Sequence, residues 1–127
     1  MGNGISTGID IVSIGRIERA NVSERFLSRL FTPSEIEYAS ASAVPHQLYA
    51  IFFAAKEATA KALGTGIGRG FGFRDIEIVS NNDTAGCRGS GVALKLHDGA
   101  ALLLGPRRTF LTVSASGDVA VAKVLIE

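Results

Sequence analysis

The sequence has little cysteine, few aromatic residues and almost no net charge. Its single cysteine, Cys87, excludes an internal disulfide and any zinc site built from several cysteines. The formal net charge is +1, and aromatic residues make up 7% of the chain without alternating with basic ones. This balance argues against a nucleic-acid-binding protein.

Long hydrophobic runs are also missing. No apolar stretch approaches the ~20 residues that a membrane-spanning helix needs. The N-terminal segment MGNGISTGID lacks a basic region followed by an apolar one, so no secretion signal is expected. We therefore expect a cytoplasmic protein with no membrane partner. The 127 residues, with 46% hydrophobic and 20% charged, suit one globular domain over residues 1–127.

The order of the predicted elements indicates an α+β fold. Strands are expected at 5–14, 73–80, 109–114 and 119–127, with loop residues at 81–91. Helical spacing covers 15–30, where Ser23 is a possible cap. The segment 92–104 fits either a strand leading into a helix or one longer helix. Because strands and helices do not alternate regularly, we expect a compact fold of antiparallel strands packed against one long helix and shorter helices.

Two helix starts are well marked. Thr32, Pro33 and Glu35 form a capping box with proline in the first helical position, which predicts a short helix from Pro33 to about residue 41. Pro45 precedes the long helix, expected at about 46–63. That helix has an apolar stripe of small and branched residues, namely Ile51, Ala55, Ala58 and Ala62. A second line on it holds Phe53, Glu57, Lys61 and Gly64.

Glycines follow this long helix in the stretch GTGIGRGFGF. A phosphate-binding loop precedes its helix, whereas these glycines lie at the helix C-terminus, whose partial negative charge disfavours phosphate. Gly64 is therefore expected to cap the helix in a left-handed conformation. An anion bound nearby would need a cation, and the candidates are Lys56, Lys61, Arg69 or a metal ion.

Two carboxylates could hold such a metal. Asp10 interrupts the apolar strand GIDIV, where an unpaired carboxylate is unfavourable, and Glu57 lies near the end of the long helix. One carboxylate from a strand and one from a helix could meet over Mg²⁺. The alternative is that Asp10 pairs with an arginine such as Arg16, and Glu57 with Lys61. Spacing alone does not decide between them.

Four segments, GIDIVSIGRI, LFTPSE, FFAAKEATAKALGTGIG and FRDIEI, together resemble the holo-acyl-carrier-protein synthases, which are small 4′-phosphopantetheinyl transferases. Their order and separations match over about residues 8–78, and a weaker similarity continues through LTVSASGDVAVAKV. The resemblance implies transfer of the 4′-phosphopantetheine of coenzyme A to a serine of an apo acyl-carrier protein. Adenosine 3′,5′-bisphosphate is the other product, and the carrier serves fatty-acid or polyketide biosynthesis.

The resemblance also implies roles for particular residues. Asp10 and Glu57 would bind Mg²⁺, and Glu57 and Lys61 would be the catalytic residues. Either Glu57 or a metal-associated water would accept the serine proton. The lysines of the helix would contact phosphate. The coenzyme A site would be bordered by Lys61, Gly64, Thr65, Gly66, Ile67 and Ser114.

Two further expectations come from the same resemblance. Arg16 and Arg25 would dock an acidic helix of the carrier, although on composition alone the basic residues here fit a solvated face shared with Glu18 and Glu24. The chain would form a homotrimer with active sites at subunit interfaces.

The sequence departs from the family pattern at two positions. Many relatives have arginine where this chain has Phe52, and histidine in the last hairpin where it has Ala115. Both changes remove groups expected near coenzyme A. They leave open a catalytically weakened relative that binds coenzyme A and the carrier, and a non-enzymatic interaction module that kept only the docking face. Retention of Asp10, Glu57 and Lys61 argues against the module.

Overall fold

The computed structural model describes residues 4–20, 23–80 and 91–127. Cys87 and all but the last residue of the loop expected at 81–91 lie outside this part. The elements in chain order are β1 (Ser6–Ser13), α1 (Ile14–Ala20), α2 (Glu24–Leu30), α3 (Pro33–Ser40), α4 (Pro45–Leu63), a 3-10 turn η1 (Phe73–Asp75), β2 (Ile76–Ser80), β3 (Val92–Leu96), α5 (Asp98–Leu104), β4 (Thr109–Ser116) and β5 (Val119–Ile126). Among these residues, no helix is both long and apolar enough to cross a bilayer.

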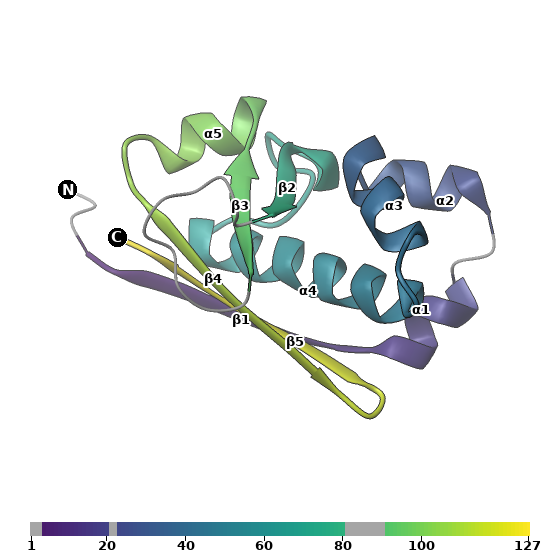
Figure 1. Ribbon diagram of the computed structural model, residues 1–127. Coiled ribbons are helices and arrows are strands. Elements are labelled where there is room, and N and C mark those ends of the chain that lie inside the picture. Colours follow the sequence, from purple (N-terminus) through teal and green to yellow (C-terminus); the bar gives the residue numbers. More distant parts are fainter. Residues whose placement is uncertain (1–3, 21–22, 81–90) are drawn as a thin grey trace.

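The long helix α4 is the centre of the molecule (Figure 1). One of its sides faces an antiparallel sheet of order β1-β5-β4, and β2 and β3 form a second antiparallel pair on its other side. Helices α1 to α3 gather at one end of the molecule. The α+β class and the antiparallel hairpin are confirmed. The ambiguous segment 92–104 is a strand followed by a helix.

The predicted helix signals are confirmed. Ser23 caps α2 by accepting a hydrogen bond from the Phe26 N–H. Thr32 and Glu35 make both bonds of the capping box at α3, and Pro33 is its first residue. Gly64 ends α4 with φ of 85°, a left-handed value that glycine adopts without penalty.

The apolar stripe of α4 allows β1 to come very close. Ile51, Ala55, Ala58 and Ala62 are all buried. At the closest point, a Cβ added to Gly8 would lie 2.0 Å from the carbonyl oxygen of Ala58. Only glycine fits there, because any side chain would push the strand off the helix. The contact fixes which residues of β1 and α4 face each other.

One prediction about this helix is wrong. Lys56 was expected to contact phosphate, but its side chain is fully buried and its ammonium lies 2.9 Å from the Glu35 carboxylate. The same ammonium donates to the backbone carbonyls of Phe73 and Ile76. Glu35 in turn accepts hydrogen bonds from the N–H groups of Thr32 and Ile78. Burial lowers the pKa of Lys56, and the negative charge of Glu35 opposes that shift. The ion pair therefore joins α3, α4 and β2.

Replacement of Lys56 by methionine is expected to destabilise the protein by about 3–5 kcal/mol, because Glu35 is left buried without its cation. Urea denaturation measures this loss. Lys61→Met is the matched control on the same helix, since the Lys61 side chain is 54% exposed, and it is expected to change stability by less than about 1 kcal/mol. Equal stability of the two variants would contradict the structural role of Lys56.

Candidate active site

Asp10 and Lys61 meet where β1 crosses α4. Asp10 is on the same face of β1 as Gly8, two residues further on, so it points toward the helix. The Lys61 ammonium lies 2.9 Å from the Asp10 carboxylate and donates to the backbone carbonyl of Ile9, also at 2.9 Å. The ion pair that forms is thus Asp10 with Lys61, neither of the two pairs considered from the sequence.

Glu57 lies one helical turn before Lys61, on the same line of α4. It is half-buried, and in the described part of the chain it forms no ion pair of its own. Burial raises the pKa of Glu57, and the nearby negative charge of Asp10 raises it further, while Lys61 opposes both. The two carboxylates are therefore close enough to repel each other, and the ammonium of Lys61 offsets that repulsion only in part.

This arrangement fits a divalent cation. A Mg²⁺ ion is commonly held by one or two carboxylates, with substrate phosphates and waters completing its shell. Asp10 and Glu57 supply two such carboxylates, and their shared surroundings already favour a positive charge, that of Lys61. The described residues contain no cluster of three or more His, Cys, Asp or Glu side chains, so a metal here would depend on substrate oxygens.

A shallow hollow of about 330 Å³ opens on the C-terminal side of Glu57. It is lined by Glu57, Ala60, Lys61, Gly64, Thr65 and Gly66. The two glycines leave their part of the wall as bare backbone, and Lys61 supplies a positive charge beside it. The hollow thus brings Glu57 together with four of the six residues predicted to border coenzyme A.

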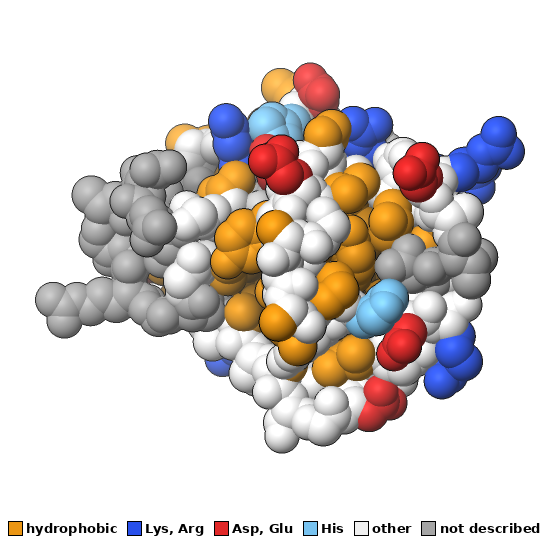
Figure 2. Space-filling view, turned by 45° about the vertical axis from the view of Figure 1, so that its right-hand side comes forward, with side chains coloured by type: hydrophobic (Ala, Val, Ile, Leu, Met, Phe, Trp, Pro, Cys, Tyr) orange, Lys and Arg blue, Asp and Glu red, His pale blue; other side chains and the backbone are white. Residues whose placement is uncertain are grey.

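A second cleft, of about 440 Å³, opens on the other side of Glu57. Its polar lining comes from Asp10, Ser13, Arg16 and Glu57. Its apolar wall comes from β1, α1, α2 and α4, through Ile11, Val12, Ile17, Ala20, Phe26, Leu30 and Phe53. Hydrophobic side chains are likewise exposed between charged ones on the side that carries the short helices (Figure 2). This wall could not be predicted from local patterns in the sequence, because it is assembled from four separate segments.

Three predicted residues lie outside these hollows. Ile67 packs against the small apolar cluster that contains Phe71 and Ala100. Ser114 is exposed on β4, on the face of the sheet that points away from α4 and Asp10. Arg25 is exposed on α2 but does not line the cleft that Arg16 lines.

Phe52 and Ala115, the two departures from the family pattern, both pack against other side chains. Phe52 is only 2% exposed, and its ring lies 6.4 Å from that of Phe31 and 6.3 Å from that of Tyr38. Ala115 is half-buried and packs against the main core. Both residues serve packing in this chain, and neither borders the hollow at Lys61.

Known proteins share both the sequence and the fold. The sequence pattern of the 4′-phosphopantetheinyl transferase superfamily matches residues 6–110. A holo-[acyl-carrier-protein] synthase of Geobacter sulfurreducens is 46% identical over 95% of each chain.

Two solved structures are similar as well. The holo-[acyl-carrier-protein] synthase of Neisseria meningitidis has a TM-score of 0.81 and 35% identity, over 96% of this chain and 97% of that one. The Helicobacter pylori enzyme in complex with coenzyme A has a TM-score of 0.78 and 32% identity, over 95% and 99%. Sequence, fold and the convergence of Asp10, Glu57 and Lys61 agree: the chain belongs to the holo-acyl-carrier-protein synthases of the 4′-phosphopantetheinyl transferase superfamily.

Proposed function

We propose that this chain transfers the 4′-phosphopantetheine of coenzyme A to an apo acyl-carrier protein at the site formed by Asp10, Glu57 and Lys61. The observation that carries the assignment is that Glu57 lines both hollows. One hollow has the glycines and Lys61, which suit a diphosphate. The other has Arg16 and an apolar wall, which suit a protein surface. A group passing from one substrate to the other would pass Glu57.

The roles of the side chains follow from their charges. Lys61 would move from Asp10 to a phosphate oxygen, where its point charge stabilises the departing bisphosphate. Asp10 and Glu57 would then hold Mg²⁺. When bound there, the ion would supply positive charge that neutralises the charge shifting toward the leaving group.

A base must take the proton of the carrier serine. The serine oxygen forms a new bond to the phosphorus as the bond to the leaving bisphosphate breaks, so the serine proton has to leave. Glu57 or a metal-associated water would accept it, and Glu57 lines the cleft by which the carrier would approach.

Asp10→Ala and Glu57→Ala are each expected to abolish transfer while the protein stays folded. Intact mass of an apo carrier incubated with coenzyme A and Mg²⁺ measures transfer, and circular dichroism measures folding. Mn²⁺ binding followed by electron paramagnetic resonance should weaken at least about tenfold in both variants, as expected when one of two ligand carboxylates is lost.

Near-normal transfer by either folded variant would refute the metal assignment. Coenzyme A binding by the wild-type protein without any gain of carrier mass would instead favour a catalytically weakened relative.

Carrier docking is proposed for the face formed by α1 and α2. Arg16 and Arg25 are both exposed there, and Arg16 stands at the cleft that leads to Asp10 and Glu57. A carrier helix with acidic residues would place its negative charges near these arginines, and an apolar side chain of it would fill the cleft. Steering of this kind acts mainly on the encounter of the two proteins.

The KM for the carrier is expected to rise with salt, because exposed charges are screened beyond about 8 Å at physiological ionic strength. Arg16→Ala should raise that KM and flatten its salt dependence. Lys95→Ala, which removes one exposed cation from β3, is the matched control and should leave both unchanged. A salt-independent KM in the wild-type enzyme would refute charged docking.

We also propose that the chain forms a homotrimer, with the face of the sheet that α4 leaves uncovered as the subunit interface. Apolar side chains are exposed on it, among them Ile9 at 51%, Phe110 at 44% and Val119 at 42%. Ser114 lies on this same face, so it could reach a site only in a neighbouring chain.

Sedimentation equilibrium is expected to give three times the 13.3 kDa of one chain. Ile9→Lys should shift the protein to monomer, while Leu102→Lys, at an 85% exposed position on α5, should not. A wild-type monomer would contradict the assembly.

A further inference from the structure

The turn between β4 and β5 is joined to the start of α1. The Asp118 carboxylate accepts a hydrogen bond from the Gly15 N–H at 2.6 Å and another from the Ser13 hydroxyl at 2.7 Å. The backbone carbonyl of Asp118 accepts from the Ile14 N–H at 2.8 Å. These bonds link residues about a hundred positions apart in the sequence.

A third N–H of the helix is bound indirectly. The Ser13 hydroxyl, which donates to Asp118, accepts a hydrogen bond from the Arg16 N–H at 3.2 Å. The first four N–H groups of a helix have no partner within it, and Asp118 and Ser13 bind three of those in α1. Because α1 has only seven residues, these bonds largely determine where it begins and in which direction it runs.

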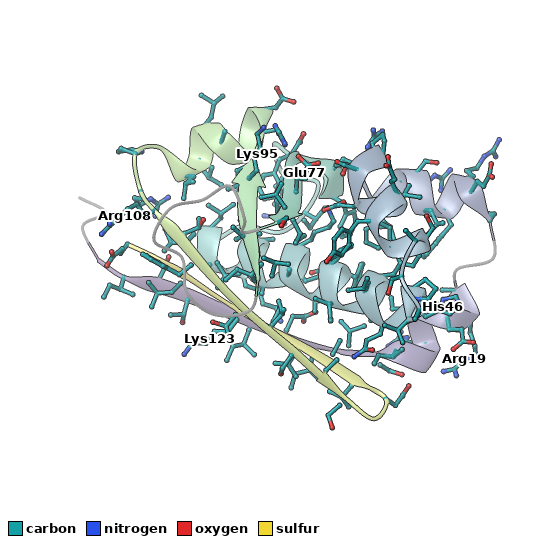
Figure 3. All side chains as sticks on the ribbon, viewed as in Figure 1. Arg19, His46, Glu77, Lys95, Arg108 and Lys123 are labelled. Atoms are coloured by element: carbon teal, nitrogen blue, oxygen red, sulfur yellow. The ribbon has the colours of Figure 1, made fainter. Side chains whose placement is uncertain are left out.

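The electrostatics of Asp118 agree with this role. Hydrogen bonds from Ser13 and from the Gly15 N–H lower its pKa, and the positive charge of Arg19 contributes a smaller part. Figure 3 shows Arg19 on α1, at the end of the sheet where the β4–β5 turn lies. A negative charge near the first turn of a helix is favourable.

The position of α1 determines where Arg16 lies relative to the cleft. Ile17 is buried beneath the helix, whereas Arg16 is exposed and lines the cleft that also contains Asp10 and Glu57. A rotation or shift of the first turn of α1 would move Arg16 away from the cleft.

We propose that Asp118 is a positioning residue for carrier docking, which holds the first turn of α1 so that Arg16 stands at the mouth of the cleft. The inference rests on the proposed docking role of Arg16. Asp118 touches neither hollow and acts through the helix alone.

Asp118→Ala is expected to raise the KM for the apo carrier by about two- to fivefold, as expected when an exposed ion pair is weakened. The kcat and the KM for coenzyme A should stay within about twofold of wild type. A purely structural defect would lower kcat by reducing the folded fraction, so the two explanations differ in which constant changes. Glu37→Gln, which neutralises an exposed carboxylate on α3, is the control and should change neither constant.

A double-mutant cycle with Arg16→Ala tests whether Asp118 acts through Arg16. If it does, the variant with both changes has the same carrier KM as Arg16→Ala alone. Fully multiplicative effects would overturn the inference. If Arg16→Ala leaves the carrier KM unchanged, the docking proposal is wrong, and the inference about Asp118 is wrong as well. If Arg16→Ala raises the KM and Asp118→Ala does not, only the inference fails.

Two further variants keep the test valid if Asp118→Ala folds poorly. Ser13→Ala removes the hydroxyl that links Asp118 to the Arg16 N–H and leaves the turn unchanged, so it should raise the carrier KM in the same direction by a smaller factor. Asp118→Asn keeps an oxygen for the Gly15 N–H and should restore most of the wild-type KM. A wild-type carrier KM in Ser13→Ala, or an Asp118→Asn variant as impaired as Asp118→Ala in folded protein, would contradict the role assigned to these hydrogen bonds.

Discussion

The close packing of β1 on α4 determines the geometry of the candidate active site. Gly8 has no side chain, so the backbone of β1 touches the carbonyl of Ala58 directly. Asp10 comes two residues later on the same face of the strand, where the long side chain of Lys61 reaches its carboxylate. The site exists because a strand without a side chain at one point crosses a helix lined with alanines.

The charged residues of α4 have two different roles: Lys56 stabilises the core, and Glu57 and Lys61 line the candidate active site. Lys56 and Lys61 are five residues apart, which places them on different sides of the helix. Lys56 is buried and holds Glu35 between α3 and β2, whereas Lys61 is half-exposed and faces Asp10. Glu57 lies between the two hollows, and its raised pKa reflects burial and the neighbouring carboxylate. A single motif, KEATAK, thus supplies Lys56 to a core ion pair and Glu57 and Lys61 to the candidate active site.

The helix boundaries around the site were predictable from local sequence signals. The capping box at Thr32 and Glu35 and the left-handed Gly64 are decided by neighbouring residues, so local rules sufficed. The proximity of Asp10 and Glu57, which line one cleft, was one of two alternatives left open by the residues, and the family resemblance favoured it. Spacing alone could not tell a buried lysine from an exposed one, so Lys56 was misassigned.

Other contacts between distant segments could not be predicted from the sequence. The carboxylate of Asp118 lies about a hundred residues from the Gly15 N–H that it binds, and no local pattern indicates such a bond. The apolar wall beside Arg16 is likewise built from four elements. The first depends on how the hairpin packs on α1, and the second on how α1, α2 and α4 pack on β1, so both are properties of the whole fold.

A crystal structure with coenzyme A and Mn²⁺, in which anomalous scattering locates the metal, would show whether Asp10 and Glu57 bind the cation. We expect an ion held jointly by the carboxylates of Asp10 and Glu57, with the Lys61 ammonium moved onto a phosphate oxygen. An ion bound by other groups, or a bound diphosphate with Asp10 still paired to Lys61 and no metal beside Glu57, would contradict it.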